Sequence, residues 1–178
     1  ISKTKSEKKM WEMVEKSDIV ACAINPVLVL GPSLSGVLSM SNRLTIKKLF
    51  NLQFVPDMAI SVVGVMDVAD AHVRAMESTK SNGKRFLLSE KTIKLVELTK
   101  ILKKAGFNKV PTRVIPNFIF KFLALFVPSL RSIAKRLGTF EKLHTKNANE
   151  LLEWFPKNVE NEIINSAKQL YNVGILKN

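Results

Sequence analysis

Apolar positions in the first ninety residues follow two patterns, helical stripes and short apolar runs. Stripes at helical spacing cover residues 2–16 and 67–78. Residues 19–24 and 60–65 are short runs that are almost wholly apolar, which is typical of strands buried on both faces. We expect these two runs to be neighbouring parallel strands of one sheet, with the two helices packed against it. This alternation predicts a doubly wound α/β fold.

The second half of the chain has a mainly helical pattern. A short strand is expected at residues 85–88, followed by helices over 93–105, 119–126 and 159–173. Three short buried strands cannot make a covered parallel sheet by themselves. The pattern therefore resembles the end of a larger sheet.

Composition and charge narrow the class of partner. The 28 Lys and Arg residues exceed the 15 Asp and Glu residues, which gives a net charge of +13. The cations are spread along the chain without a basic run interleaved with aromatic residues, so we expect a solvated lysine-rich surface and no nucleic-acid partner. The most apolar stretch, residues 118–127, is shorter than the about 20 residues that span a membrane, so we expect no membrane partner.

The number of cysteines bears on the cellular compartment of the protein. Cys22 is the only cysteine, so the chain has no intramolecular disulfide, and a lone thiol fits a reducing cytoplasm. The start, rich in Ser and Lys, is not typical of a secretory signal. We therefore predict a cytoplasmic protein.

The sequence contains no complete catalytic motif. It has no Gly-x-Gly-x-x-Gly and no phosphate-binding loop. Cys22, His72 and His144 do not have the spacing of metal ligands, so no metal site is predicted.

Four segments, in the same order, resemble one enzyme family. Ser2-Lys3-Thr4 and the residues after it are similar to the helix that follows the Tyr-x-x-x-Lys motif of extended short-chain dehydrogenases. This resemblance is strongest to the dihydroflavonol reductase and cinnamoyl-CoA reductase group of the NAD-dependent epimerase/dehydratase superfamily. The other three segments are residues 24–32 (INPVLVLGP), 65–73 (VMDVADAHV) and 147–154 (NANELLEW).

The resemblance implies a Rossmann-type fold and a division of the chain. Residues 1–30 and 60–90 would be the C-terminal strands and helices of the dinucleotide-binding domain. Residues 31–59 and 91–178 would form a mostly helical substrate-binding domain. The motif tyrosine would stand two positions before Ile1, and the only tyrosine present is Tyr171. We therefore interpret the chain as a C-terminal portion that is inactive alone.

The resemblance also implies residue roles. Lys3 would be the catalytic lysine and would bind the nicotinamide ribose of the cofactor. Its charge favours tyrosinate and lowers the tyrosine pKa from about 10 toward working pH. Pro26 would lie near the nicotinamide, although a proline there is also consistent with a simple turn. Ser39 and Ser41 would lie near the cofactor phosphates, and ordinary helix-surface serines are the alternative.

Other conspicuous residues have simpler interpretations. Asp67 is interpreted as a helix N-cap, His72 as a core histidine, and Cys22 as an inert thiol in a buried strand. Residues 118–127 are interpreted as core or as a wall of a substrate pocket, with a membrane-surface helix as the alternative.

These observations predict the C-terminal portion of an NAD(P)H-dependent oxidoreductase that reduces a small aldehyde or ketone. The cofactor would be NADP or NAD, and the whole enzyme a possible homodimer. Two alternatives are a nucleotide-sugar epimerase or dehydratase of the same superfamily and a non-catalytic NAD(P)-binding protein.

Overall fold

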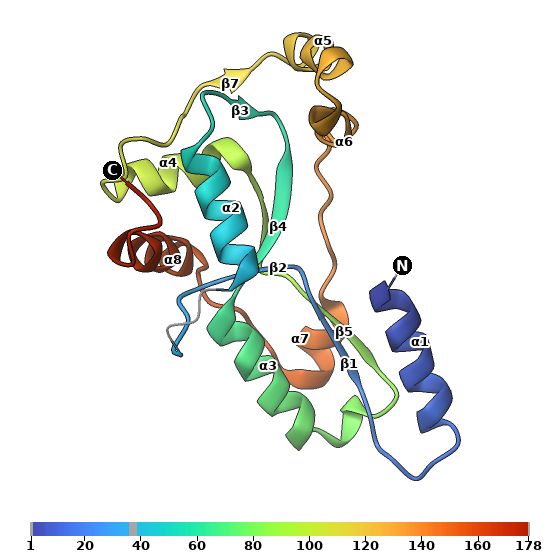
Figure 1. The fold of residues 1–178 in the computed structure, drawn as a ribbon. Helices are drawn as coiled ribbons and strands as arrows, with labels where there is room; N and C mark the ends of the chain where they lie inside the picture. The colour runs from blue at the N-terminus through green and yellow to red at the C-terminus, as the bar shows by residue number, and fades with distance from the viewer. Residues whose placement is uncertain (1, 36–38, 178) are drawn as a thin grey trace.

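A computed structural model describes residues 2–35 and 39–177, except for the side chain of Ser41 (Figure 1). The helices are α1 (Ser2–Val14), α2 (Met40–Phe50), α3 (Val65–Glu77), α4 (Leu95–Lys104), α5 (Asn117–Phe126), α6 (Arg131–Ala134), α7 (Lys146–Leu152) and α8 (Glu160–Asn172). The strands are β1 (Ala23–Pro26), β2 (Leu28–Leu30), β3 (Val55–Pro56), β4 (Ala59–Gly64), β5 (Arg85–Leu88), β6 (Lys91–Lys94) and β7 (Val114–Ile115). Short 3₁₀ turns η1 and η2 cover Thr79–Ser81 and Pro128–Leu130.

The strands form three small sheets. β1 pairs in parallel with β5, and β3 pairs in parallel with β7. The third sheet has the order β2-β4-β6, with β2 and β4 parallel and β6 antiparallel to β4. The predicted α/β class is confirmed.

The predicted pairing of residues 19–24 with residues 60–65 is wrong. β1 and β4 lie in separate sheets, because the extended stretch from Ala23 to Leu30 changes partner at Val27. Before Val27 this stretch pairs with β5, and after it the stretch pairs with β4. Pro26 accordingly ends a strand and does not make a turn.

The first part of the predicted strand 19–24 is not a strand. Ile19 and Val20 are 66% and 70% exposed, and regular pairing begins only at Ala23, opposite Arg85. The apolar run is therefore longer than the part of it that pairs with β5. The ladder is short because β5 itself has four residues.

Two apolar cores join the helices to the sheets. One gathers side chains of β2, β4, α2, α4 and α8. The other lies between the β1-β5 pair, α3 and α7, and contains the fully buried Trp154 and Phe86. The indole Nε1 of Trp154 donates to the Asp67 carbonyl at 2.8 Å, so the segment after α7 is bonded to the first turn of α3.

Two helical parts lie at the edges of these cores. Helix α1 lies beside the β1-β5 pair with no buried residue among those described (Figure 1). In α5 only Phe120 and Ala124 are buried, so the interpretation of residues 118–127 as core is wrong. Within the described residues no helix is long and apolar enough to cross a membrane.

Candidate functional site

Ligands of open α/β sheets bind outside the carboxyl ends of parallel strands. Here two parallel pairs end close together in the chain. β1 ends at Pro26, and its continuation β2 ends at Leu30, beside the end of β4 at Gly64. This edge of the two sheets is therefore where a site is expected.

Helix α1 is joined to the first of these pairs by one ion pair. The Arg85 guanidinium on β5 makes two hydrogen bonds to the Glu7 carboxylate, one at 3.2 Å, and the Trp11 indole donates to the same group at 3.4 Å. Hydrogen bonding to Arg85 lowers the pKa of the Glu7 carboxyl, and the side chain of Asn25 on β1 contributes in the same direction. Glu7 therefore marks the face of α1 that points at β1 and β5.

Lys3 lies one helical turn before Glu7 on that face, since residues four apart lie one above the other. Its side chain is exposed. α1 runs opposite to β1, so its first turn lies toward the carboxyl end of the strand, where Pro26 is also exposed (Figure 1). Lys3 and Pro26 thus occupy the same end of the β1-β5 pair.

Ser39 lies in a different place. It is the N-cap of α2, where its Oγ accepts a hydrogen bond from the Asn42 backbone N–H at 3.2 Å. Ser41 lies within α2, but its side chain is outside the described part of the chain. The interpretation of Ser39 as an ordinary helix-surface serine is thereby refined, because its hydroxyl caps a helix.

Ser39 borders a cavity of about 480 Å³ at the carboxyl ends of β2 and β4. Its walls include Val29, Val65 and Met66, and Lys3 and Pro26 do not line it. The buried Asn42 donates its side-chain amide to the Gly31 carbonyl. Its Oδ1 atom is buried without a hydrogen-bond partner in the described structure.

Acidic side chains gather behind this cavity. Asp67 is not the N-cap of α3, because the helix begins at Val65 and Gly64 is the N-cap. The Asp67 carboxylate instead accepts the Lys157 backbone N–H at 3.1 Å, and the Glu90 carboxylate accepts that of Val159 at 2.6 Å.

Burial raises the pKa of two acids in this region. Desolvation raises the pKa of Glu90 and of Glu162, and the nearby Asp67 carboxylate raises both further. The described residues contain no group of three or more ligating side chains that could hold a metal ion.

His72 and Cys22 do not have the predicted environments. His72 is exposed, because it faces away from the core residues Ala71 and Ala75 of α3, and its Nδ1 lies 2.7 Å from the Val68 carbonyl. The interpretation as a core histidine is therefore wrong. Cys22 is half-buried just before β1 and, with His72, borders a cavity of about 460 Å³.

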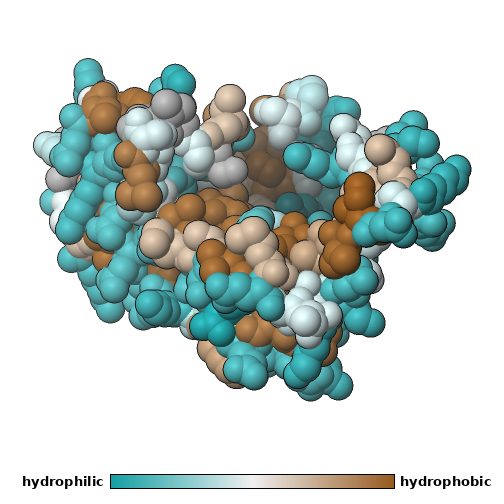
Figure 2. All heavy atoms as spheres, turned by 90° about the horizontal axis from the view of Figure 1, so that it is seen from below, coloured by the Kyte–Doolittle hydropathy of each residue, from teal (hydrophilic) through white to brown (hydrophobic). Residues whose placement is uncertain are grey.

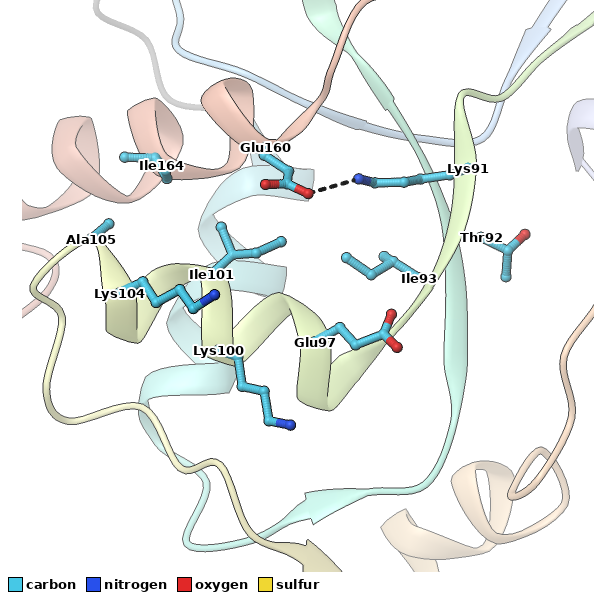
Figure 3. A pocket seen from close by; sticks show the side chains of 10 residues that line it. All are labelled: Lys91, Thr92, Ile93, Glu97, Lys100, Ile101, Lys104, Ala105, Glu160 and Ile164. Atoms are coloured by element: carbon cyan, nitrogen blue, oxygen red, sulfur yellow. Dashed lines mark hydrogen bonds and ion pairs between the residues drawn. The ribbon is translucent and has the colours of Figure 1, made fainter.

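A slightly larger cavity, about 510 Å³, lies between β6, α4 and α8 (Figure 3). Lys91 reaches across it to Glu160 at 3.1 Å, above a floor that includes Ile93 and Ile101. It borders the antiparallel strand β6 and no predicted site residue. We therefore place the candidate site at the carboxyl ends of the parallel strands.

Three residues of this region were not singled out from the sequence. Glu7 lies in the first segment that resembles the reductase family, although its ion pair with Arg85 depends on the fold. Asn42 and Glu162 carried no signal in the sequence, since only the packing of α2 and α8 buries the Asn42 side chain and the Oε2 atom of Glu162.

Comparison with known proteins now tests the resemblance. A cinnamoyl-CoA reductase of Medicago truncatula is 34% identical over 104 residues, which are 58% of this chain and 32% of that enzyme. Other curated relatives include cinnamoyl-CoA reductases of Arabidopsis thaliana. The chain is a homologue of these reductases. The resemblance predicted from its sequence is confirmed, and no family model matches it.

Solved structures confirm the Rossmann-type fold for this reductase homologue. The reductase Gre2 of Candida albicans, in complex with NADPH, matches with a TM-score of 0.63 and 25% identity over 94% of this chain and 49% of that one. Vestitone reductase of Medicago sativa matches with a TM-score of 0.70 and 21% identity over 98% and 52%. The chain spans about a third of its curated relative and about half of these structures.

Proposed function

We propose that the chain contributes the C-terminal part of an NADPH-dependent reductase of small aldehydes or ketones. The observation that carries this proposal is the position of Lys3. The Glu7–Arg85 ion pair turns one face of α1 toward β1 and β5. Lys3 is one turn before Glu7, in the first turn of α1, and that turn lies toward the carboxyl end of β1 (Figure 1). The homology to cinnamoyl-CoA reductases supports the same reaction class.

Lys3 has two roles in this proposal. Its ammonium group would lower the pKa of a tyrosine four positions earlier in the whole protein, so that the phenol can protonate a carbonyl oxygen. It would also donate hydrogen bonds to the nicotinamide ribose. Pro26, at the end of β1, would border the nicotinamide, and Ser39 and Ser41 would lie toward the phosphates.

NADPH is the proposed cofactor because the matched Candida albicans reductase was solved with it. The residues present fit part of such a group, since Ser39 borders a cavity of about 480 Å³ at the carboxyl ends of β2 and β4. When bound, NADPH supplies the hydride.

The division into domains is proposed with the function. Residues 1–30 and 60–90 would belong to the dinucleotide-binding domain, and residues 31–59 and 91–178 to the substrate-binding domain. We also propose a cytoplasmic location, where Cys22 would stay reduced. A homodimer is a further prediction for the whole enzyme, which light scattering tests.

The experiment compares two lysines of α1 in the whole protein, expressed with the residues encoded before Ile1. Lys3→Ala should lower kcat for NADPH-dependent reduction of simple aldehydes by about 100-fold or more, because the proton donor loses its cation. It should also move the pH optimum upward, since an unassisted tyrosine titrates near about 10.

Lys5→Ala is the matched control, because Lys5 is equally exposed and lies on another side of the same helix. Its kcat and pH profile should match those of the unaltered enzyme. Equal kinetics for Lys3→Ala and Lys5→Ala would remove Lys3 from the mechanism. Absence of carbonyl reduction by the unaltered whole protein would contradict the proposed function itself.

A further inference from the structure

Helix α5 exposes an unusual amount of apolar surface. The exposed fractions are 74% for Phe118, 60% for Phe122, 66% for Leu125 and 71% for Phe126. These residues follow one another at i, i+4, i+7 and i+8, so they lie on one face of the helix. Phe120 and Ala124, which are buried, lie on the opposite face. The helix is therefore attached by one side and presents large apolar side chains on the other.

The attachment of α5 is well defined. The Arg131 guanidinium of α6 donates to the Ala124 carbonyl at 3.3 Å and to the Leu125 carbonyl at 3.2 Å. These bonds satisfy carbonyls at the C-terminal end of α5 that the helix leaves free. They hold α5 and α6 together at the far end of the molecule from the β1-β5 pair (Figure 1).

The stretch of sequence that contains this helix is rich in cations and lacks acidic residues. Between residues 98 and 140 the sequence has no Asp or Glu and nine cations, which are Lys100, Lys103, Lys104, Lys109, Arg113, Lys121, Arg131, Lys135 and Arg136. No ion pair involves any of these nine within this fully described stretch. Lys121 lies within α5, and Lys135 and Arg136 follow α6 directly.

We propose that α5 and α6 form a surface that binds to the face of anionic membranes without crossing them. Apolar side chains of an interfacial helix enter the boundary of the acyl chains while flanking Lys and Arg contact lipid phosphates. The four apolar residues of this face supply the first contact, and the exposed Lys121 within α5 supplies the second. A helix of this length lies on the bilayer and does not cross it.

The charges favour a lipid over a second copy of the chain. Two copies that met through α5 would bring the same unpaired cations together, which opposes association. An anionic bilayer satisfies both the apolar face and the cations.

Co-sedimentation with vesicles of the whole protein that contains this chain tests the proposal. Vesicles of phosphatidylcholine and phosphatidylglycerol in equal parts should bind the chain, vesicles of phosphatidylcholine alone should bind it far less, and salt should weaken the binding. The double variant Phe122→Ser, Phe126→Ser should lose roughly tenfold or more in partitioning, because two rings no longer enter the lipid. Lys121→Gln should lose roughly fivefold.

Phe155→Ser is the matched control, because Phe155 is 72% exposed but lies outside α5. It should bind as the unaltered chain does. A fluorescence readout adds the depth of insertion: brominated lipids should quench Phe122→Trp and leave Phe155→Trp unaffected. Absence of binding to anionic vesicles, or equal loss in the α5 and Phe155 variants, would overturn the proposal. Self-association that the α5 double variant abolishes, without vesicle binding, would assign the surface to a second copy instead.

Discussion

Glu162 is placed in the first turn of α8 with a carboxylate oxygen that is shut off from solvent. Its Oε2 atom has no hydrogen-bond partner among the described residues. The side chain packs over two backbone positions that lack a Cβ, with its Cγ 3.1 Å from where a Cβ on Gly64 would lie. Desolvation, together with the Asp67 carboxylate, therefore raises the pKa of Glu162 above its ordinary value of 4.5.

This raised pKa predicts a pH-dependent gain from Glu162→Gln. The Glu162 carboxyl binds its proton more tightly in the folded chain than in the unfolded chain. The stability that this tighter binding contributes is complete below pH 4.5 and is lost as the pH rises through the raised pKa. The glutamine keeps the shape without the charge. The melting temperature of the Glu162→Gln variant should exceed that of the unaltered chain at neutral pH. The difference between the two should shrink toward zero below pH 4.5.

Glu77→Gln is the control for net charge, because Glu77 is exposed at the end of α3. It removes the same charge without relieving burial, so its melting temperature should follow the unaltered chain at every pH. A Glu162→Gln protein that is less stable at neutral pH would show that the carboxylate makes a favourable interaction there.

Residue environments were the least predictable part of this chain. The helical pattern around His72 suggested an apolar face, but the core uses Ala71 and Ala75, and His72 points away. Asp67 has the residue type of an N-cap, yet the helix starts two residues earlier and its carboxylate bonds to Lys157. Such environments depend on which distant segment packs nearby, and a single sequence does not contain that information.

At the scale of elements, Gly31 shows why β2 and α8 can approach each other. It has φ +150°, and a Cβ there would lie 2.2 Å from Val65 Cγ1 and 2.8 Å from Glu162 Oε2. Both contacts are too close for any side chain. The glycine therefore lets the end of β2 pass directly beneath the starts of α3 and α8.

Gly31→Ala should consequently lower the free energy of unfolding by about 2–4 kcal/mol, because it adds steric overlap to an unfavourable backbone angle. Gly83→Ala is the comparison. Gly83 also has a positive φ of +68°, but its Cβ would meet nothing within 4 Å. That variant should lose only about 1 kcal/mol. Urea unfolding of the two proteins measures the difference, and equal losses would mean that the close contacts around Gly31 relax freely.

The elements themselves were more predictable than their pairing. Helical spacing identified α3, α5 and α8 to within three residues at each end, because each helix has a periodic apolar stripe. Sheet pairing was not readable in the same way. A strand buried on both faces has the same pattern whichever neighbour it pairs with, so nothing in residues 19–24 revealed that β5 would be their partner.

The candidate site was predictable only where a motif carried it. Lys3 and Pro26 were found through the family resemblance, and both lie at the carboxyl end of β1 (Figure 1). Asn42, which borders the neighbouring cavity, belongs to no motif and is buried by the fold alone. Their roles in binding and catalysis stay predictions.

At the scale of the whole molecule, apolar surface and net charge act against each other. Figure 2 shows apolar side chains gathered across the middle of one face, with hydrophilic side chains around them. Ile19, Val20, Met76 and the α5 face are all largely exposed. These surfaces favour association, whereas the net charge of +13 keeps copies apart through mutual repulsion.

This balance predicts how the chain responds to salt. At low ionic strength the repulsion is long-ranged, but at about 1 M salt the screening length falls to about 3 Å and the charges no longer hold copies apart. The mass measured by light scattering should therefore rise with salt, whereas binding to anionic vesicles should fall. The opposite directions separate the two processes in one protein preparation. A mass that falls on adding salt would mean that ion pairs, and not apolar surface, hold the copies together.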